Sequence, residues 1–125
     1  MARMQDRIVV VTGAANGLGR ATAIRLAQEG ASLVIGDIEA EALASTAAEI
    51  TALDRPVHTL VGDLTEPEAA ERLIETAISQ HGQIDGLVNN MGGSRNAKIW
   101  EMSIEDWDYT LRLNLRGTFL CTRFA

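Results

Sequence analysis

Short apolar runs alternate along this chain with segments whose apolar residues have helical spacing. Four such runs, residues 8–12, 32–36, 57–61 and 84–89, have the length and composition of strands. Strands that alternate with helices form consecutive βα units, and such units build a parallel sheet. The runs are largely apolar at successive positions, which indicates that helices cover both faces of the sheet. The pattern therefore predicts a three-layer α/β/α sandwich.

Helix-ending and helix-starting residues divide the segments between these runs. The expected helices are residues 17–29, residues 39–53, a helix that Thr65 opens and Gly82 closes, and a final helix capped by Ser103. Thr65 and Glu68 have the spacing of a capping box, and Pro67 falls in the first turn, where proline is tolerated.

The composition limits the class of protein. The 125 residues show no repeat or linker, so we expect a single domain over residues 1–125. A formal net charge of −6 argues against a nucleic-acid partner and against anionic membranes. The apolar runs fall far short of the about 20 residues that a membrane-spanning helix needs. Cys121 is the only cysteine, and the N-terminal residues lack the pattern of a secretory signal, which favours a soluble, cytoplasmic protein.

A glycine-rich turn follows the first expected strand and opens the first expected helix. It contains Gly13, Asn16, Gly17, Leu18 and Gly19 in the spacing G-x-x-x-G-x-G. Glycines at such a turn let the backbone N–H groups and a helix terminus approach a diphosphate closely. The turn therefore predicts a dinucleotide site; a glycine-rich turn that binds no ligand is the alternative.

Two acidic residues follow the second and third strands. Asp37, with Ile38 beside it, stands where a carboxylate can accept hydrogen bonds from both ribose hydroxyls of an adenosine. It would repel a 2′-phosphate, and no Arg or Lys is adjacent, so the sequence favours NAD over NADP. Asp63, followed by Leu64, could reach the adenine edge. Either aspartate could instead cap the helix that follows it.

Polar and small residues end the fourth strand. Asn89, Asn90, Met91 and Gly92 stand on the carboxyl side of the expected sheet, where open α/β folds bind ligands. A simple loop start is the alternative. Neither His58 nor His81 belongs to a metal-ligand pattern, and no metal site is expected.

The last helix carries two apolar stripes. Asn114 shares one stripe with Trp107, Leu111, Leu115 and Thr118, and an amide on such a face needs its hydrogen bonds met. The second stripe is Leu113, Gly117, Leu120 and Phe124. One stripe can face the sheet, and we expect the second, with its costly glycine, to meet a partner chain or chain segments beyond Ala125.

Taken together, these motifs resemble the short-chain dehydrogenase/reductase family over essentially the whole chain. The glycine turn resembles that family's cofactor turn, Asp37 its NAD-selecting acid, and Asp63 with Leu64 its adenine contact. Residues 89–92 are similar to its N-N-A-G, with Met91 in place of the usual Ala. Asn114 corresponds to the Asn of the family's catalytic tetrad of Asn, Ser, Tyr and Lys.

The resemblance implies a Rossmann-like fold and an NAD-dependent oxidoreductase that acts on an alcohol or ketone. It also implies a homo-oligomer that forms through the last helix. The family's Tyr-x-x-x-Lys pair is missing, because Tyr109 is followed four residues later by Leu113, and Lys98 precedes it. We therefore expect this chain to be the cofactor-binding half of a longer enzyme, truncated after about four strands and inactive alone. The alternatives are a non-catalytic NAD-binding module and an NADP-dependent 3-oxoacyl-type reductase.

Overall fold

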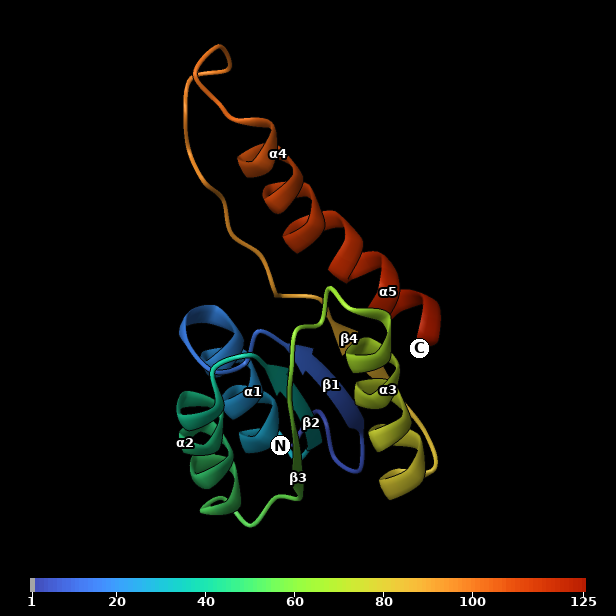
Figure 1. Cartoon of the computed structure of the whole chain (residues 1–125). Helices are drawn as coiled ribbons and strands as arrows, with labels where there is room; N and C mark the ends of the chain where they lie inside the picture. The colour runs from blue at the N-terminus through green and yellow to red at the C-terminus, as the bar shows by residue number, and fades with distance from the viewer. Residues whose placement is uncertain (1) are drawn as a thin grey trace.

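The computed structural model describes residues 2–125 and contains one parallel sheet with helices on both faces (Figure 1). Its strands are β1 (Ile8–Thr12), β2 (Ser32–Asp37), β3 (Val57–Val61) and β4 (Gly86–Val88). Their order across the sheet is β3-β2-β1-β4, and every neighbouring pair is parallel. The predicted fold class is confirmed.

Helical segments pack on both faces of the sheet and also extend beyond it. They are α1 (Gly17–Gln28), α2 (Ala40–Thr51), α3 (Pro67–His81), α4 (Ile104–Leu111), a π-helical turn η1 (Arg112–Arg116) and α5 (Gly117–Phe124). Helices α1 and α2 contact the sheet on one face, and α3 contacts it on the other, with α5 packed on α3. Figure 1 shows α4, η1 and α5 as one long rod that extends beyond the edge of the sheet.

Alternate residues of the central strands supply two separate cores. Val9 and Val11 of β1 pack with the alanines of α1 and with Leu43 and Ile50 of α2. Val10, between them, faces the α3 side. This two-sided burial is the reason that β1 is apolar at successive positions.

The edge strands are less buried than the sequence predicts. β3 is only half-buried, and β4 pairs with β1 alone and is shorter than the six residues expected. Most other ends of elements differ from the predictions by one or two residues, which is ordinary for helix and strand boundaries.

The predicted capping box at Thr65 is wrong. Helix α3 begins at Pro67, and Glu66 occupies the N-cap position without a side-chain cap. Thr65 is buried, and its backbone N–H and hydroxyl both donate to Asp63 Oδ1, at 2.9 and 2.6 Å. The other two helix-end predictions are confirmed: Gly82 closes α3 in the left-handed conformation, and Ser103 Oγ accepts from Asp106 N at 3.1 Å.

The expected single last helix is interrupted by η1, and its two stripes have the opposite roles to those predicted. Gly117 and Leu120 are buried against this chain's own core, whereas Leu111 and Leu115 are 42% and 66% exposed. The stripe expected to meet a partner therefore packs internally. No helix within residues 2–125 has the length and apolar character needed to cross a bilayer.

Candidate functional site

An open cleft of about 580 Å³ lies at the carboxyl ends of the strands. The residues that line it come from the carboxyl ends of the four strands and the turns that follow them, and from α4 and η1. They are Gly13, Asn16, Gly17, Asp37, Ile38, Glu39, Gly62, Asp63, Leu64, Thr65, Asn90, Met91, Gly92, Tyr109, Arg112 and Leu113. Ligands of open α/β sheets bind at this edge.

The three glycines of the first turn have different physical requirements. Gly13 and Gly17 have φ of +66° and +56°, a conformation that side chains disfavour. A Cβ at Gly17 would meet no atom within 4 Å, so the space in front of it is open. A Cβ at Gly19 would lie 2.0 Å from Gly13 O and 2.4 Å from Asn90 Nδ2. Gly19 therefore allows close packing, and Gly17 leaves the backbone accessible from the cleft.

Helix α1 lacks the side chains that usually pair with the N–H groups at a helix N-terminus. Its N-cap residue, Asn16, makes no side-chain cap, and its first turn contains no acidic residue. Helix α4, by contrast, has a serine cap and two acidic residues in its first turn. The first N–H groups of α1 and the positive end of its dipole are thus available to an anion at the rim of the cleft.

Asp37 is held by two backbone donors. Its Oδ2 accepts from Ala15 N at 3.0 Å, and its Oδ1 accepts from Glu39 N at 3.1 Å. The second contact is part of the helix-capping role that the sequence left open, although α2 itself begins one residue after Glu39. The first contact ties the carboxylate to the glycine turn. Each oxygen can accept a further hydrogen bond from a ligand.

Asp63 is arranged differently, because the two Thr65 donors converge on its Oδ1. Burial raises the pKa of Asp63, but these hydrogen bonds and the charge of Arg112 outweigh burial, and its pKa lies below the ordinary value. The carboxylate is therefore charged at neutral pH. Its neighbour Leu64 is buried and contributes an apolar surface to the cleft.

The end of β4 is attached to the end of β1 through Thr12. Its buried hydroxyl accepts from Asn90 N and Met91 N, both at 3.0 Å. Asn90 Nδ2 donates to Gly13 O at 3.1 Å. These contacts fix the Asn-rich strand end beside the glycine turn, so the two motifs form one wall of the cleft.

Asn114 lies in the π-helical turn and does not line the cleft. Its Oδ1 accepts from Gly93 N at 3.2 Å, and its Nδ2 donates to Thr110 O at 2.8 Å and to Gly93 O. The side chain is exposed, so it is not the core amide that the stripe pattern suggested, but its hydrogen bonds are met. Asn114 connects the last helix to the loop after β4. π-Helical turns occur often at functional sites.

Ten of the twelve residues predicted to bind a cofactor line this cleft. The two that do not are Leu18, which is 80% exposed beside the turn, and Gly19, which is buried behind it. Sequence reasoning missed Glu39, Gly62 and Thr65 as residues of the cleft, and also Tyr109 of α4 and Arg112 and Leu113 of η1. The last three have i, i+3, i+4 spacing and so share one helical face, which was the available signal.

Arg112 is the only cationic side chain among the described residues that line the cleft, which also contains Asp37, Glu39 and Asp63. Its Nε donates to Thr65 Oγ1 at 2.9 Å, and it forms an ion pair with Glu66. Its charge is therefore engaged in holding the loop after β3.

Comparison with known proteins identifies relatives of the whole chain. The sequence profile of short chain dehydrogenases matches residues 7–125. Over 120 residues the chain is 41% identical to the (2S)-[(R)-hydroxy(phenyl)methyl]succinyl-CoA dehydrogenase subunit BbsD of Thauera aromatica. This match covers 96% of this chain and 48% of that protein. Over 123 residues it is 38% identical to the 3-oxoacyl-[acyl-carrier-protein] reductase FabG of Thermotoga maritima. This match covers 98% of this chain and 50% of that protein.

Solved structures agree with the sequence matches. The crystal structure of carveol dehydrogenase from Mycobacterium avium in complex with NAD superposes with a TM-score of 0.94 at 31% identity. That superposition covers 99% of this chain and 50% of the other. The chain thus spans about half the length of the relatives that it matches.

Proposed function

Because the chain belongs to the short-chain dehydrogenase family, we propose that its cleft binds NAD(H). The protein would then act as an oxidoreductase that transfers hydride between this cofactor and an alcohol or carbonyl substrate. In this proposal residues 1–125 are the cofactor-binding half, with a Rossmann-like fold. The observation that most supports the proposal is the uncapped N-terminus of α1, next to the open space in front of Gly17.

The residues of the cleft suit a dinucleotide diphosphate and its adenosine. The N–H groups at Asn16 and Gly17 would receive the diphosphate, and Asp37 would accept hydrogen bonds from the ribose hydroxyls. Ile38 and Leu64 offer apolar surface to a flat base, with Asp63 at its edge. Leu18 and Gly19 would act by shaping the turn.

The bound nicotinamide would supply the hydride acceptor or donor, and the chain would orient it. Asn90, Met91 and Gly92, at the end of β4, line the part of the cleft beside η1. We propose that Asn114 belongs to the catalytic constellation as the family resemblance implies. It would act there by positioning the Gly93 backbone, with which its amide exchanges two hydrogen bonds.

The preference for NAD over NADP rests on charge. Asp37 is fixed at the rim by two backbone donors, and a 2′-phosphate would lie against it. Arg112, the cation of the cleft, already pairs with Glu66. The NAD complex of carveol dehydrogenase supports this choice, whereas similarity to a 3-oxoacyl-[acyl-carrier-protein] reductase supports the alternative of an NADP-dependent 3-oxoacyl-type reductase.

Titration of the full-length protein with NADH and NADPH tests the proposal. We expect tighter binding of NADH, and Asp37→Ala should reduce the ratio of the two affinities about tenfold by removing the like-charge repulsion. Glu41→Ala, an exposed acid in the first turn of α2, is the control and should leave the ratio unchanged. A protein that binds neither nucleotide would contradict the proposal, and an unchanged ratio in Asp37→Ala would remove Asp37 from it.

Hydride transfer with a panel of secondary alcohols separates the enzyme from a non-catalytic NAD-binding module. The pair that the family uses for proton transfer is not found in these residues: Tyr109 lines the cleft, but the residue four positions later is Leu113. We therefore propose that residues 1–125 alone bind the cofactor without turnover.

Assembly and location belong to the same proposal. A homo-oligomer would form through the last helix, on the exposed stripe of Trp107, Leu111, Leu115 and Phe119, which are 42–66% exposed. A cytoplasmic location is consistent with Cys121 being a buried free thiol. A small alcohol or ketone remains the proposed substrate class.

A further inference from the structure

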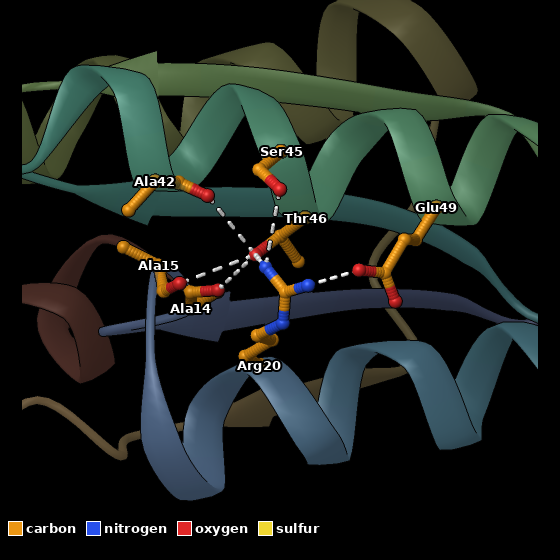
Figure 2. Close-up of polar contacts among 7 residues, drawn as sticks. All are labelled: Ala14, Ala15, Arg20, Ala42, Ser45, Thr46 and Glu49. Atoms are coloured by element: carbon orange, nitrogen blue, oxygen red, sulfur yellow. Dashed lines mark hydrogen bonds and ion pairs between the residues drawn. The ribbon is translucent and has the colours of Figure 1, made fainter.

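A buried threonine lies behind the glycine turn, on the side away from the cleft. Thr46 of α2 is fully buried, and its hydroxyl points toward carbonyls of the turn (Figure 2). Its Oγ1 lies 3.0 Å from Ala14 O, 3.3 Å from Ala15 O and 3.3 Å from Ala42 O. A hydroxyl has one proton, so it can donate fully to only one of these carbonyls at a time.

Arg20 of α1 restricts how that hydroxyl is used. Arg20 Nη1 donates to Thr46 Oγ1 at 3.3 Å and to Ser45 Oγ at 3.4 Å, and the guanidinium forms an ion pair with Glu49 (Figure 2). A guanidinium has donors only, so Thr46 Oγ1 must accept from it. One lone pair of the hydroxyl is thus occupied, and its proton is directed to the carbonyls, of which Ala14 O is nearest.

The direction of these carbonyls sets the direction of two N–H groups. In a trans peptide the C=O and the following N–H point in opposite directions. The Ala14 carbonyl faces Thr46, and the Ala15 N–H of the same peptide donates to Asp37 Oδ2. In the same way, the Ala15 carbonyl faces Thr46, which directs the Asn16 N–H away from α2. One buried hydroxyl therefore orients the peptides that hold Asp37 and begin the turn.

We propose that Thr46 is a positioning residue for dinucleotide binding, and that Arg20 orients its hydroxyl. The inference rests on the proposed function: it concerns how the same cleft is held in its binding geometry before the ligand arrives. A cradle whose peptides are already fixed binds with a lower ordering cost, and loss of the hydroxyl would remove the buried donor that the Ala14 and Ala15 carbonyls share and would loosen these peptides.

The test compares NADH affinity and thermal stability in full-length variants. Thr46→Val keeps the shape of the side chain and removes the hydroxyl, and we expect it to raise the NADH Kd about tenfold, since buried carbonyls lose their donor. Thr46→Ser keeps the hydroxyl and should restore the affinity to within about twofold of wild type. Titration well below each variant's melting temperature separates binding from stability.

Thr51→Val is the matched control. Thr51 is on the same helix and its hydroxyl donates to Ala47 O at 2.9 Å, but it is exposed and does not touch the turn. The same chemical change there should leave the Kd unchanged. A folded Thr46→Val protein with wild-type affinity would overturn the inference.

A second variant decides the case if Thr46→Val does not fold. The Arg20 side chain is 31% exposed, so Arg20→Met is expected to fold. It should raise the NADH Kd about threefold, because the hydroxyl loses its orientation but remains; an unchanged Kd would overturn the inference. Wild-type protein that fails to bind NADH would remove the proposed function and this inference together, whereas equal binding by wild type and Thr46→Val removes the inference alone.

Discussion

Gly17 and Gly19 lie two residues apart in one turn, but each position requires glycine for a different reason. Alanine substitutions should therefore have different effects at the two positions. Gly19→Ala should lower the free energy of unfolding by about 3 kcal/mol, because the new methyl meets backbone that cannot yield. Gly17→Ala should cost only about 1 kcal/mol, the strain of a positive φ, but weaken NADH binding at least about tenfold by blocking the open face. Urea unfolding and NADH titration measure the two effects.

Gly82→Ala is the control for Gly17. Gly82 has φ of +76° and, like Gly17, has no atom within 4 Å of the point where a Cβ would lie, but it does not line the cleft and follows the C-terminus of α3, whereas the cleft residue Thr65 precedes the N-terminus of that 15-residue helix. It should show the same small loss of stability with an unchanged NADH Kd. If Gly17→Ala behaved identically to Gly82→Ala in both measurements, the turn would not be the diphosphate site.

Between elements, the contact of the β4 loop with α5 explains an unusual side chain. Met91 stands where the family resemblance implies Ala, and its Cε would lie 2.1 Å from a Cβ added at Gly117. The glycine therefore makes room for the methionine within one chain. Gly117, which the sequence analysis expected to contact a partner chain or later segments, is therefore covered by Met91 of its own chain.

This packing predicts a coupled pair. In a Met91→Ala background, Gly117→Ala should raise the free energy of unfolding by about 1 kcal/mol, since alanine is the better helix residue. In the native background the gain should vanish or reverse, because the Met91 side chain must move. A double-mutant cycle by urea unfolding measures the coupling, and additivity of the two changes would show that Met91 does not occupy this space.

For the molecule as a whole, two groups at the ends of different helices, His81 of α3 and Glu29 after α1, set separate pH ranges of acid sensitivity. Loss of hydration, and then the nearby His58 ring, lowers the pKa of His81. Its folded pKa is below the unfolded value of about 6.5, so the unfolded state binds the proton first as the pH falls. Stability should therefore decline as the pH drops below about 6.5. His81→Leu should flatten the pH dependence of the urea-unfolding midpoint in the range below about pH 6.5.

Glu29 acts at lower pH. A hydrogen bond from Arg3, aided by its backbone N–H and by Arg25, lowers the pKa of Glu29 to about 2. The stability that it contributes is present above its unfolded pKa of about 4.5 and is lost as the pH falls from there toward 2. Glu29→Gln should remove this lower window and leave that of His81 intact; a single window abolished by either substitution would refute the assignment.

Assembly is the remaining prediction for the entire molecule. Leu115 is 66% exposed on the stripe proposed to meet a second copy. Leu115→Lys should shift the full-length protein toward monomer in sedimentation velocity, because a buried lysine without a partner is costly at an interface. Ile78→Lys, at an exposed apolar site on α3, is the control and should leave the distribution unchanged.

Local patterns in the sequence were enough to predict the sheet, its parallel strands and most of the cleft. The strand runs are short, uninterrupted and bounded by turn residues, so their type could be recognised without knowing their neighbours. The polar residues at strand ends could be assigned to one edge, because parallel strands bring their carboxyl ends together. Gly13, Asp37 and Asn90 were found in this way.

The features that the sequence did not reveal depend on which surfaces meet. Thr65 has the spacing of a cap, but its hydroxyl instead donates to Asp63 and accepts from Arg112, which is 47 residues away in the chain. The two stripes of the last helix are both apolar, and only the contacts of Gly117 and Leu120 with the core decide which one is buried. A pattern of apolar residues indicates that a helix face must be buried. It does not identify the residues that bury that face, because those neighbours are remote in sequence and are set by the tertiary structure.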